Sequence, residues 1–323
     1  MKRREFIGLV GGAAAWPLTA SAQRAEGKLA TIGILAIEPW PSIDTFRHAL
    51  NALGYIGGKN VRFEYRYANE DNERLPELAN ELVGLNVDVI FTWRTDAVLA
   101  AKQATATIPI VMGVIGDPVR SGIVTNLARP GGNITGCSLR VAELEAKRLQ
   151  LLKEVVPGLS RVAILLNPTN RYMPLALEST QKGAQVLHVS LAVYKVHDTT
   201  TLDAAFVTLT KDRPNAFLVP ADTFLVSQRS RIAQFAIENK LPSVYSFREY
   251  IEAGGLIAYT PNYDDLFRRA ASYVDKILKG ANPGELPIER PSTFQLFINL
   301  KTARALGLTV PRTLLASADE LIE

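Results

Sequence analysis

Polar and aromatic side chains stand at the ends of several predicted strands, which is where open parallel sheets bind their ligands. Trp93, Arg94 and Thr95 lie at the exit of one strand, and Asn167 and Asp222 lie at the exits of two others. Apolar walls with a few hydrogen-bonding groups are what small-molecule sites require. The candidate ligand-binding residues are Trp40, Trp93, Arg94, Thr95, Asp117, Asn167, Asn170, Asp222, Tyr245 and Tyr259.

The pair Trp93 and Arg94 occupies a strand exit where a tight turn of small residues is expected. If both side chains face a cleft, Trp93 offers a flat wall for a ring and Arg94 a planar fork for a carboxylate. The ligand is then an aromatic or unsaturated anion. The alternative is a solvated Arg94 and a Trp93 that packs on the next helix. An amino acid also fits, since Asp222 suits its ammonium group and Tyr245 and Tyr259 suit an aromatic side chain.

Motifs for catalysis are missing from the sequence. It contains no G-x-x-x-x-G-K-[ST] phosphate loop, no G-x-G-x-x-G after a strand and no G-x-S-x-G elbow. His48, His188 and His197 are far apart, which favours surface or helix histidines over a zinc site. Cys137 is the only cysteine, so no disulfide can form within the chain. We therefore expect no cofactor, no metal and no catalysed reaction, with an enzyme as the outside alternative.

The elements that position these residues alternate along the chain between short β-branched runs and amphipathic helical stretches. Strands joined by helices need crossover connections, which build a parallel sheet covered on both faces. The pattern begins near Leu29 and starts again near Arg161, so we expect an α/β protein with two doubly wound parallel-sheet lobes. The first strands are predicted at 30–37, 61–67, 88–93 and 109–115, and the second set at 161–167, 190–196, 215–221 and 242–247.

Three segments are predicted to pass between the two lobes, at 129–140, 254–262 and 290–299. The helix at 264–280 is expected to pack back on the first lobe, because the chain after Tyr263 is too short for a third domain. The predicted division is 29–137 plus 260–289 for lobe 1 and 138–259 plus 290–323 for lobe 2.

The first 22 residues have the pattern of an export signal. A basic start precedes a short apolar stretch, and Ala20-Ser21-Ala22 provides a cleavage site after Ala22. Arg3-Arg4 fits the twin-arginine pattern, with an ordinary secretory signal as the alternative. We therefore expect a periplasmic protein. Cleavage leaves a net charge of +2 out of +4, which does not favour nucleic-acid binding.

Several segments of the sequence resemble one known family, the extracytoplasmic substrate-binding proteins of ABC transporters, in the subgroup that includes tryptophan-binding-like lipoproteins. The resemblance implies the type I periplasmic-binding fold with a three-crossover hinge, a small-molecule ligand and an ABC permease in the inner membrane as partner. We expect a monomer. The segments that carry the resemblance are F-R-x-x-L-x-x-L-G-Y at 46–55, R-L-P-E-L-A at 74–79, I-P-I-V at 108–111, G-D-P-V at 116–119, L-A-R-P-G-G-N-I-T-G at 127–136, N-P-T-N at 167–170, Y-S-F-R-E at 245–249 and I-N-L-K-T-A-R-A-L-G-L-T-V-P at 298–311, together with the N-terminal K-R-R-E-F-I-G-L-V-G-G-A-A-A-W-P-L.

One departure from the family concerns the strand exit described first. Family members look similar to T-G-G-T-P-A there, whereas this chain has Thr92-Trp93-Arg94-Thr95-Asp96-Ala97. The family's usual ligand therefore cannot be assumed. A ligand-sensing module for a chemoreceptor or kinase shares this fold and is the alternative function. Sugar-responsive repressors also share it, but they begin with a DNA-binding helix-turn-helix.

Replacing Arg3 and Arg4 by lysine tests the export route. The twin-arginine receptor reads paired guanidinium groups, so we expect the Lys-Lys precursor to remain in the cytoplasm. Immunoblots of cytoplasmic and periplasmic fractions measure its distribution. Normal accumulation in the periplasm would instead indicate the general secretory route.

Overall fold

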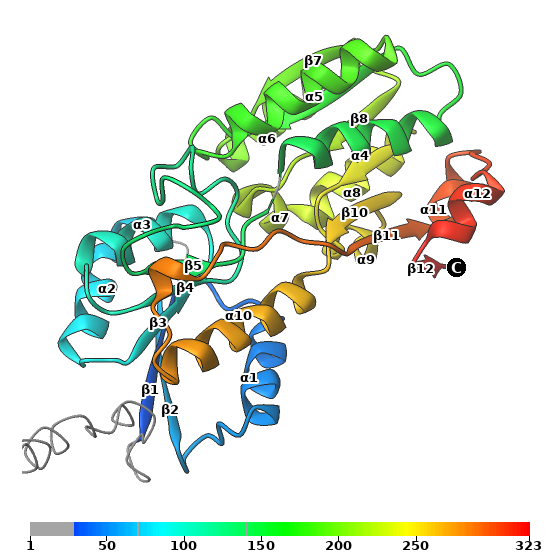
Figure 1. Cartoon of the computed structure of the whole chain (residues 1–323). Helices are drawn as coiled ribbons and strands as arrows, with labels where there is room; N and C mark the ends of the chain where they lie inside the picture. The colour runs from blue at the N-terminus through cyan, green and yellow to red at the C-terminus, as the bar shows by residue number, and fades with distance from the viewer. Residues whose placement is uncertain (1–28, 70, 140) are drawn as a thin grey trace, which may run out of the picture.

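Two lobes with central strands and flanking helices make up the computed structural model in Figure 1. The structure describes residues 29–69, 71–139 and 141–323, so the predicted signal peptide at 1–22 lies outside the described residues. Within this part of the chain, no helix combines the length and apolar character of a membrane span.

The first lobe is built around a five-stranded sheet in which all strands run parallel. Its strands are β1 (Ala30–Ala36), β2 (Val61–Tyr67), β3 (Val89–Thr92), β4 (Ile110–Met112) and β5 (Ile134–Gly136), in the order β2-β1-β3-β4-β5. Its helices are α1 (Ile43–Ala52), α2 (Leu75–Gly84), α3 (Thr95–Ala104) and α10 (Tyr263–Leu278), with the short 3-10 helices η1 (Asn72–Arg74) and η2 (Pro283–Glu285). Because parallel strands need crossovers, helices cover both faces of the sheet.

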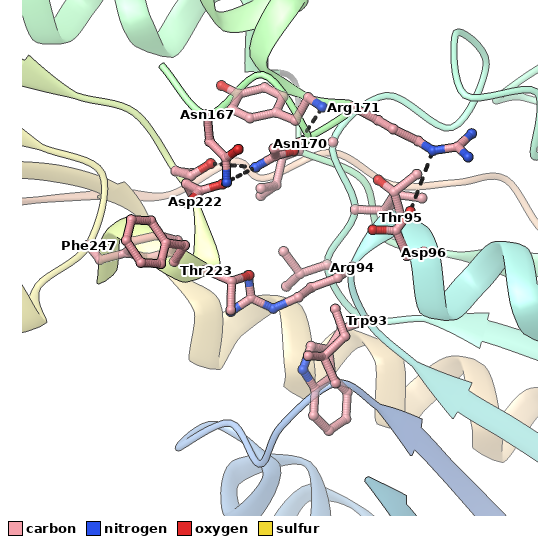
Figure 2. Close-up of a pocket in the computed structure, with 18 of the residues that line it drawn as sticks. Trp93, Arg94, Thr95, Asp96, Asn167, Asn170, Arg171, Asp222, Thr223 and Phe247 are labelled. Carbon is pink, nitrogen blue, oxygen red and sulfur yellow. Dashed lines mark hydrogen bonds and ion pairs between the residues drawn. The ribbon is translucent and has the colours of Figure 1, made fainter. Parts of the chain in front are cut away.

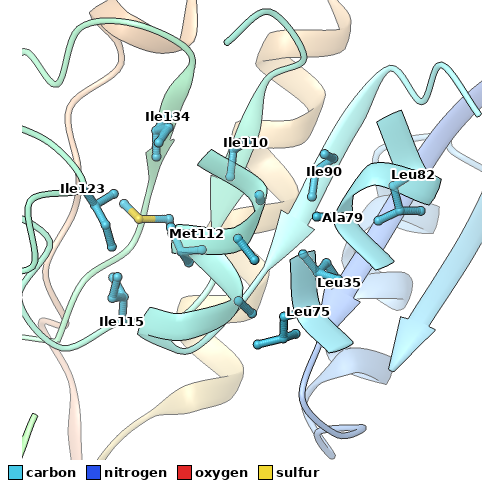
Figure 3. Packing of buried hydrophobic residues seen from close by; sticks show 14 of the residues in the cluster. Leu35, Leu75, Ala79, Leu82, Ile90, Ile110, Met112, Ile115, Ile123 and Ile134 are labelled. Carbon is cyan, nitrogen blue, oxygen red and sulfur yellow. The ribbon is translucent and has the colours of Figure 1, made fainter. Parts of the chain in front are cut away.

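Apolar side chains at helical spacing fill the two faces of this sheet. Leu75 and Leu82 of α2 pack with Ile90 of β3 on one face, as Figure 3 shows. On the other face, Phe46 of α1 stacks on Phe91 with ring centroids 4.0 Å apart, in the same cluster as buried residues of α10. The predicted packing of the 264–280 helix on the first lobe is therefore confirmed.

The second lobe contains a seven-stranded sheet that is also covered on both faces. Its strands are β6 (Arg161–Leu166), β7 (Ser190–Lys195), β8 (Ala216–Val219), β9 (Ser243–Tyr245), β10 (Ile257–Pro261), β11 (Phe294–Asn299) and β12 (Glu320–Ile322), in the order β12-β11-β10-β9-β8-β6-β7. Its helices are α4 (Val141–Val155), α5 (Met173–Leu187), α6 (Thr199–Asp212), α7 (Thr223–Ser227), α8 (Arg229–Glu238), α9 (Glu249–Glu252), α11 (Leu300–Ala305) and α12 (Arg312–Ser317).

The second sheet corrects one part of the prediction, because it is mixed rather than wholly parallel. β10 and β11 are antiparallel, and β12 follows the direction of β11. The physical reason lies in the path of the chain: β10 leads out of this lobe into α10, and β11 leads back in. Two adjacent strands that carry the chain in opposite directions must run antiparallel.

Three segments between the lobes lie side by side at the hinge. Ser138 N–H donates to the carbonyl of Glu289 (2.8 Å), and Glu289 N–H donates to the carbonyl of Gly136 (2.9 Å). Asn262 N–H donates to the carbonyl of Thr293 (3.0 Å). The third segment therefore hydrogen-bonds to both of the others. At the predicted boundary at 260, Thr260 still pairs within the second sheet.

Gly136 is the point at which the first crossing leaves the sheet, and its φ of 128° suits glycine. A Cβ atom there would lie 2.2 Å from the carbonyl oxygen of Met112, a backbone atom held in β4. We expect Gly136→Ala to lower the free energy of unfolding by at least about 3 kcal/mol. Urea denaturation measures this loss.

Gly122→Ala provides the matched control, because Gly122 also has a positive φ (67°) but has no atom within 4 Å of the added Cβ. It should cost only about 1 to 2 kcal/mol, which is the backbone contribution alone. Equal losses for the two variants would contradict the steric explanation.

Candidate ligand-binding site

A cavity of about 380 Å³ lies between the two lobes, where the carboxyl ends of both sets of strands meet. Figure 2 shows side chains from both lobes directed into this region. The first lobe contributes Ile37, Trp40, Asn72, Trp93, Arg94, Thr95, Asp96, Val114, Ile115 and Gly116, and α10 and the segment before it contribute Pro261 and Tyr263. The second lobe contributes Leu139, Leu144, Arg148, Asn167, Thr169, Asn170, Arg171, Tyr172, His197, Ala221, Asp222, Thr223, Phe224, Ser227 and Phe247.

Most of the residues proposed from the sequence line this cavity. They are Trp40, Trp93, Arg94, Thr95, Asn167, Asn170 and Asp222. The reason is the one used for the prediction: loops that follow parallel strands gather at one edge of a sheet. Because the two sheets face each other across the hinge, residues far apart in sequence meet there.

Three of the proposed residues lie elsewhere. Asp117 caps its own turn, since its Oδ1 accepts the N–H groups of Val119 and Arg120 at 3.0 Å each. Tyr245 lies inside β9 rather than after it, is fully buried, and stacks on Tyr250 at 4.3 Å. Tyr259 lines a separate hollow between α4, β11 and α12. Side chains alternate between the two faces of a strand, and the sequence pattern did not show which tyrosines point away from the cavity.

Asp222 is the centre of a buried hydrogen-bond network in the second lobe. Its Oδ2 accepts the side-chain amides of Asn167 (3.1 Å) and Asn170 (2.8 Å), and its Oδ1 accepts the N–H of Leu225 (2.8 Å) at the start of α7. Only 3% of Asp222 is exposed. All three donors are neutral, so no cation is bonded to this carboxylate. It can therefore attract a cationic group in the cavity.

On the opposite wall, the N-terminus of α3 opens into the cavity. Arg94 stands at the N-cap position but its side chain makes no capping hydrogen bond. Among the described residues, no acceptor contacts the backbone N–H groups of Thr95, Asp96 and Ala97. The free N–H groups and the helix dipole favour negative charge at this end, and the hydroxyl of Thr95 lies beside them.

The Arg94 side chain crosses the cleft between the lobes. Its Nη2 forms an ion pair with Glu38 at 2.9 Å, its Nη1 donates to the hydroxyl of Thr223 at 2.5 Å, and its guanidinium carbon lies 5.0 Å from the centre of the Trp40 ring. Burial lowers the pKa of Arg94, and the nearby Glu38 carboxylate opposes that effect. The terminal nitrogens that were predicted to hold a ligand carboxylate thus already have partners within the protein.

The backbone of Arg94 is unusual as well. Its φ of 68° and ψ of 146° fall near a region that is almost restricted to glycine. A side chain in such a conformation costs roughly 1 to 3 kcal/mol, so the contacts of the guanidinium must offset this strain.

The sequence left open whether Trp93 faces the cleft or packs on a helix, and the structure shows features of both. Trp93 borders the cavity, yet only 1% of it is exposed, and its ring lies 5.6 Å from that of Phe91 and 5.7 Å from that of Phe267 in the core of the first lobe. Figure 2 shows the indole directed away from Arg94. Its packing partner on a helix is α10, not the next helix along the chain.

Aromatic residues that the sequence argument missed form much of the wall. Trp40 makes edge contacts with Phe247 (5.8 Å) and Tyr263 (5.3 Å), which brings together residues of both lobes. Phe247 ends the strand predicted at 242–247, and Tyr263 directly follows the second predicted crossing. Both therefore lie next to the end of a predicted element, as the residues proposed from the sequence do. Tyr172 lies at the N-cap of α5, and no feature of the sequence marked it as a cavity residue.

A second buried charged group lies where α4 approaches the cavity. Arg148 forms an ion pair with Glu145 and donates through Nε to the carbonyl of Tyr259 (2.8 Å). The hydroxyl of Tyr172 also donates to Glu145, at 3.0 Å. Burial raises the pKa of Glu145, while Arg148 and the Tyr172 hydroxyl oppose the rise. Arg148 and Tyr172 border the cavity, so this group completes one wall of it.

Within the described part of the chain, no cluster of three or more His, Cys, Asp or Glu side chains could hold a metal ion. The cavity itself presents fixed hydrogen-bonding groups and aromatic rings. A carboxylate faces it from one lobe, free backbone N–H groups face it from the other, and aromatic rings lie between them.

Comparison with known proteins gives a consistent result. A family model described as ABC transporter substrate binding protein matches residues 40–322. A tyrosine-binding protein from Clostridioides difficile is 27% identical over 285 residues, which cover 87% of this chain and 82% of that protein.

Two solved structures have a similar fold over almost the whole chain. The ABC domain from Streptococcus pneumonia in complex with L-Trp has a TM-score of 0.84 and 25% identity, and a conserved domain protein from Vibrio cholerae has a TM-score of 0.84 and 27% identity. Each match covers 91% of this chain and 100% of the other. The predicted two-lobed α/β fold is confirmed by these likenesses.

The Asp222 network predicts a measurable effect on stability. Asp222→Ala leaves the amide of Asn167 and the N–H of Leu225 without their acceptor in a buried setting, while Asn170 keeps only a longer bond to the carbonyl of Ala221 (3.4 Å). We therefore expect the free energy of unfolding to fall by about 3 kcal/mol. Asp117→Ala is the control, because Asp117 also caps backbone N–H groups but on an exposed turn, and it should cost about 1 kcal/mol. Thermal and urea denaturation compare the two. A loss for Asp222→Ala no greater than that for Asp117→Ala would contradict the importance of this network.

Proposed function

The chain belongs to the ABC transporter substrate binding protein family, and from this premise we propose that its cavity captures an aromatic L-amino acid such as tyrosine or tryptophan. Proteins of this family bind a solute for a transporter and are not enzymes. The observation that carries the proposal is the placement of opposite polar groups across one cavity. Asp222 faces it from the second lobe, and the free N-terminus of α3 faces it from the first.

The ammonium group of the ligand is proposed to bind at Asp222. Its carboxylate is buried and bonded only to neutral donors, so a cation would add the missing counter-charge. A charge-assisted hydrogen bond in such a desolvated place is stronger than one between neutral groups.

The carboxylate of the ligand is proposed to bind at the N-terminus of α3. Thr95 and the two residues after it offer backbone N–H groups without acceptors, and Thr95 adds a hydroxyl. We do not assign this role to Arg94, because each of its terminal nitrogens already donates to a protein partner, Thr223 or Glu38.

The ring of the ligand is proposed to lie against the aromatic wall. Phe247, Tyr263 and Tyr172 border the cavity and provide flat apolar surface. Rings gain from offset or edge contacts with such surfaces. The names of two relatives support this class of ligand, since one is a tyrosine-binding protein and another was solved with L-Trp.

The family and the N-terminal sequence support a proposal for the cellular setting. We propose that the signal peptide at 1–22 directs the chain to the periplasm and that the loaded protein delivers its ligand to an ABC permease in the inner membrane. The hinge of three hydrogen-bonded segments would let the lobes open and close around the ligand, as two-lobed binding proteins do.

Calorimetric titration with L-tyrosine and L-tryptophan tests the proposal. Binding to the native state alone should raise the melting temperature by mass action. Tyramine lacks the carboxylate and 3-(4-hydroxyphenyl)propionate lacks the ammonium group, so each should bind more weakly than tyrosine by about 2 to 5 kcal/mol. Equal affinity for tyrosine and both analogues would contradict the proposed orientation of the ligand.

Two variants test which residue binds which end of the ligand. Asp222→Asn should remove the preference for tyrosine over 3-(4-hydroxyphenyl)propionate, which lacks the ammonium group. Thr95→Val should reduce the preference for tyrosine over tyramine, which lacks the carboxylate. A failure of all aromatic amino acids to bind the wild-type protein would reject the ligand class itself.

A further inference from the structure

Three groups that surround the guanidinium of Arg94 have the chemistry of a cation-binding site. The carboxylate of Glu38 lies 2.9 Å from Nη2, the hydroxyl of Thr223 lies 2.5 Å from Nη1, and the ring of Trp40 lies 5.0 Å from the guanidinium carbon. A carboxylate, an oxygen acceptor and an aromatic face are the partners that a planar guanidinium prefers. We call Glu38, Trp40 and Thr223 the guanidinium subsite.

The guanidinium subsite is assembled from both lobes. Glu38 and Trp40 follow β1 in the first lobe, and Thr223 begins α7 in the second. Trp40 and Thr223 also line the cavity between the lobes, as does Arg94. The Arg94 side chain therefore reaches from the first lobe to a residue of the second.

The backbone indicates that this side chain is held in place at a cost. Arg94 has φ 68° and ψ 146°, a conformation that glycine adopts without strain and arginine does not. Nothing in the local chain requires arginine there, because its side chain does not cap α3. What the side chain gains lies in its contacts with Glu38 and Trp40 of its own lobe and with Thr223 across the cleft.

We propose that the guanidinium subsite is a binding site for alkylguanidinium cations that Arg94 fills from within the chain, which confines a free ligand to the rest of the cavity. Arg94 is then a specificity-determining residue. Its charge neutralises Glu38, so the subsite itself does not attract a free guanidinium compound, and its bond to Thr223 joins the lobes without a ligand. That the cleft binds a solute rests on the proposed function; the chemistry of the subsite does not.

Chemical rescue of Arg94→Gly tests the inference. Glycine suits the backbone conformation, and its substitution empties the subsite without a steric clash. Ethylguanidinium at millimolar concentration should raise the melting temperature of Arg94→Gly in a saturable way, by about 3 °C at ten times its Kd. The wild-type protein, whose subsite is filled, should show no such rise.

Two controls make the result specific to the subsite. Ethylammonium has the same charge but no planar fork, so it should not stabilise Arg94→Gly. The double variant Arg94→Gly with Glu38→Gln lacks the carboxylate and should lose at least tenfold in affinity for ethylguanidinium. Rescue by ethylammonium to the same extent, or no saturable effect of ethylguanidinium on Arg94→Gly, would overturn the proposal.

A second measurement applies to a protein that keeps Arg94. Thr223→Val preserves the shape of the side chain but removes the acceptor that joins the lobes. In small-angle scattering without ligand, Thr223→Val should show a larger radius of gyration than the wild-type protein. Equal radii would refute the bridging role, whether or not Arg94→Gly folds.

These experiments are independent of the amino acid that the protein captures. If tyrosine and tryptophan fail to bind but ethylguanidinium rescues Arg94→Gly, the proposed function fails and the subsite stands. If both amino acids bind and no rescue is seen, the reverse holds.

Discussion

The site depends on one constraint, which is that the two sheets face each other across a single hinge. In each sheet the parallel strands end at one edge, so the loops that follow them gather there. The crossings at 137–139, after Pro261 and between Glu289 and Phe294 hold those two edges opposite each other. A residue needs only to follow a strand in either lobe to reach the cavity, which explains how Thr95 and Asp222 come to share it.

The hinge itself is held by backbone hydrogen bonds rather than by side-chain packing alone. The segment around Glu289 bonds to the first crossing, and the segment around Thr293 bonds to the second. Since β10 carries the chain out of the second sheet and β11 brings it back, these strands must be antiparallel neighbours. Such a hinge fixes the position of the crossings while each sheet keeps its own core, so the lobes can move as units.

Charge in the cleft is balanced locally. Glu38 pairs with Arg94, and Glu145 pairs with Arg148. Asp222 is the exception, because its direct partners are amides and a backbone N–H. Unpaired charge is costly in a desolvated place unless hydrogen bonds or a ligand compensate it. Asp222 is therefore the group that we propose to bind the ammonium of the ligand, whereas the terminal nitrogens of Arg94 already have partners within the protein.

The sequence alone determined the alternation of strands and helices, the repetition of the pattern in two lobes and the three crossings. These features depend on the local periodicity of apolar residues and on the short connections between successive elements. The sequence also identified Trp40, Thr95, Asn167, Asn170 and Asp222 as cavity residues, since their positions after strands follow from topology. Only the tertiary structure decided the direction of individual side chains. Tyr245 and Tyr259 carry the right chemistry but point elsewhere, and Arg94 reaches the cleft with its two terminal nitrogens already bonded to Thr223 and Glu38. Those partners lie 56 and 129 positions away, and no local pattern in a sequence records contacts over such separations.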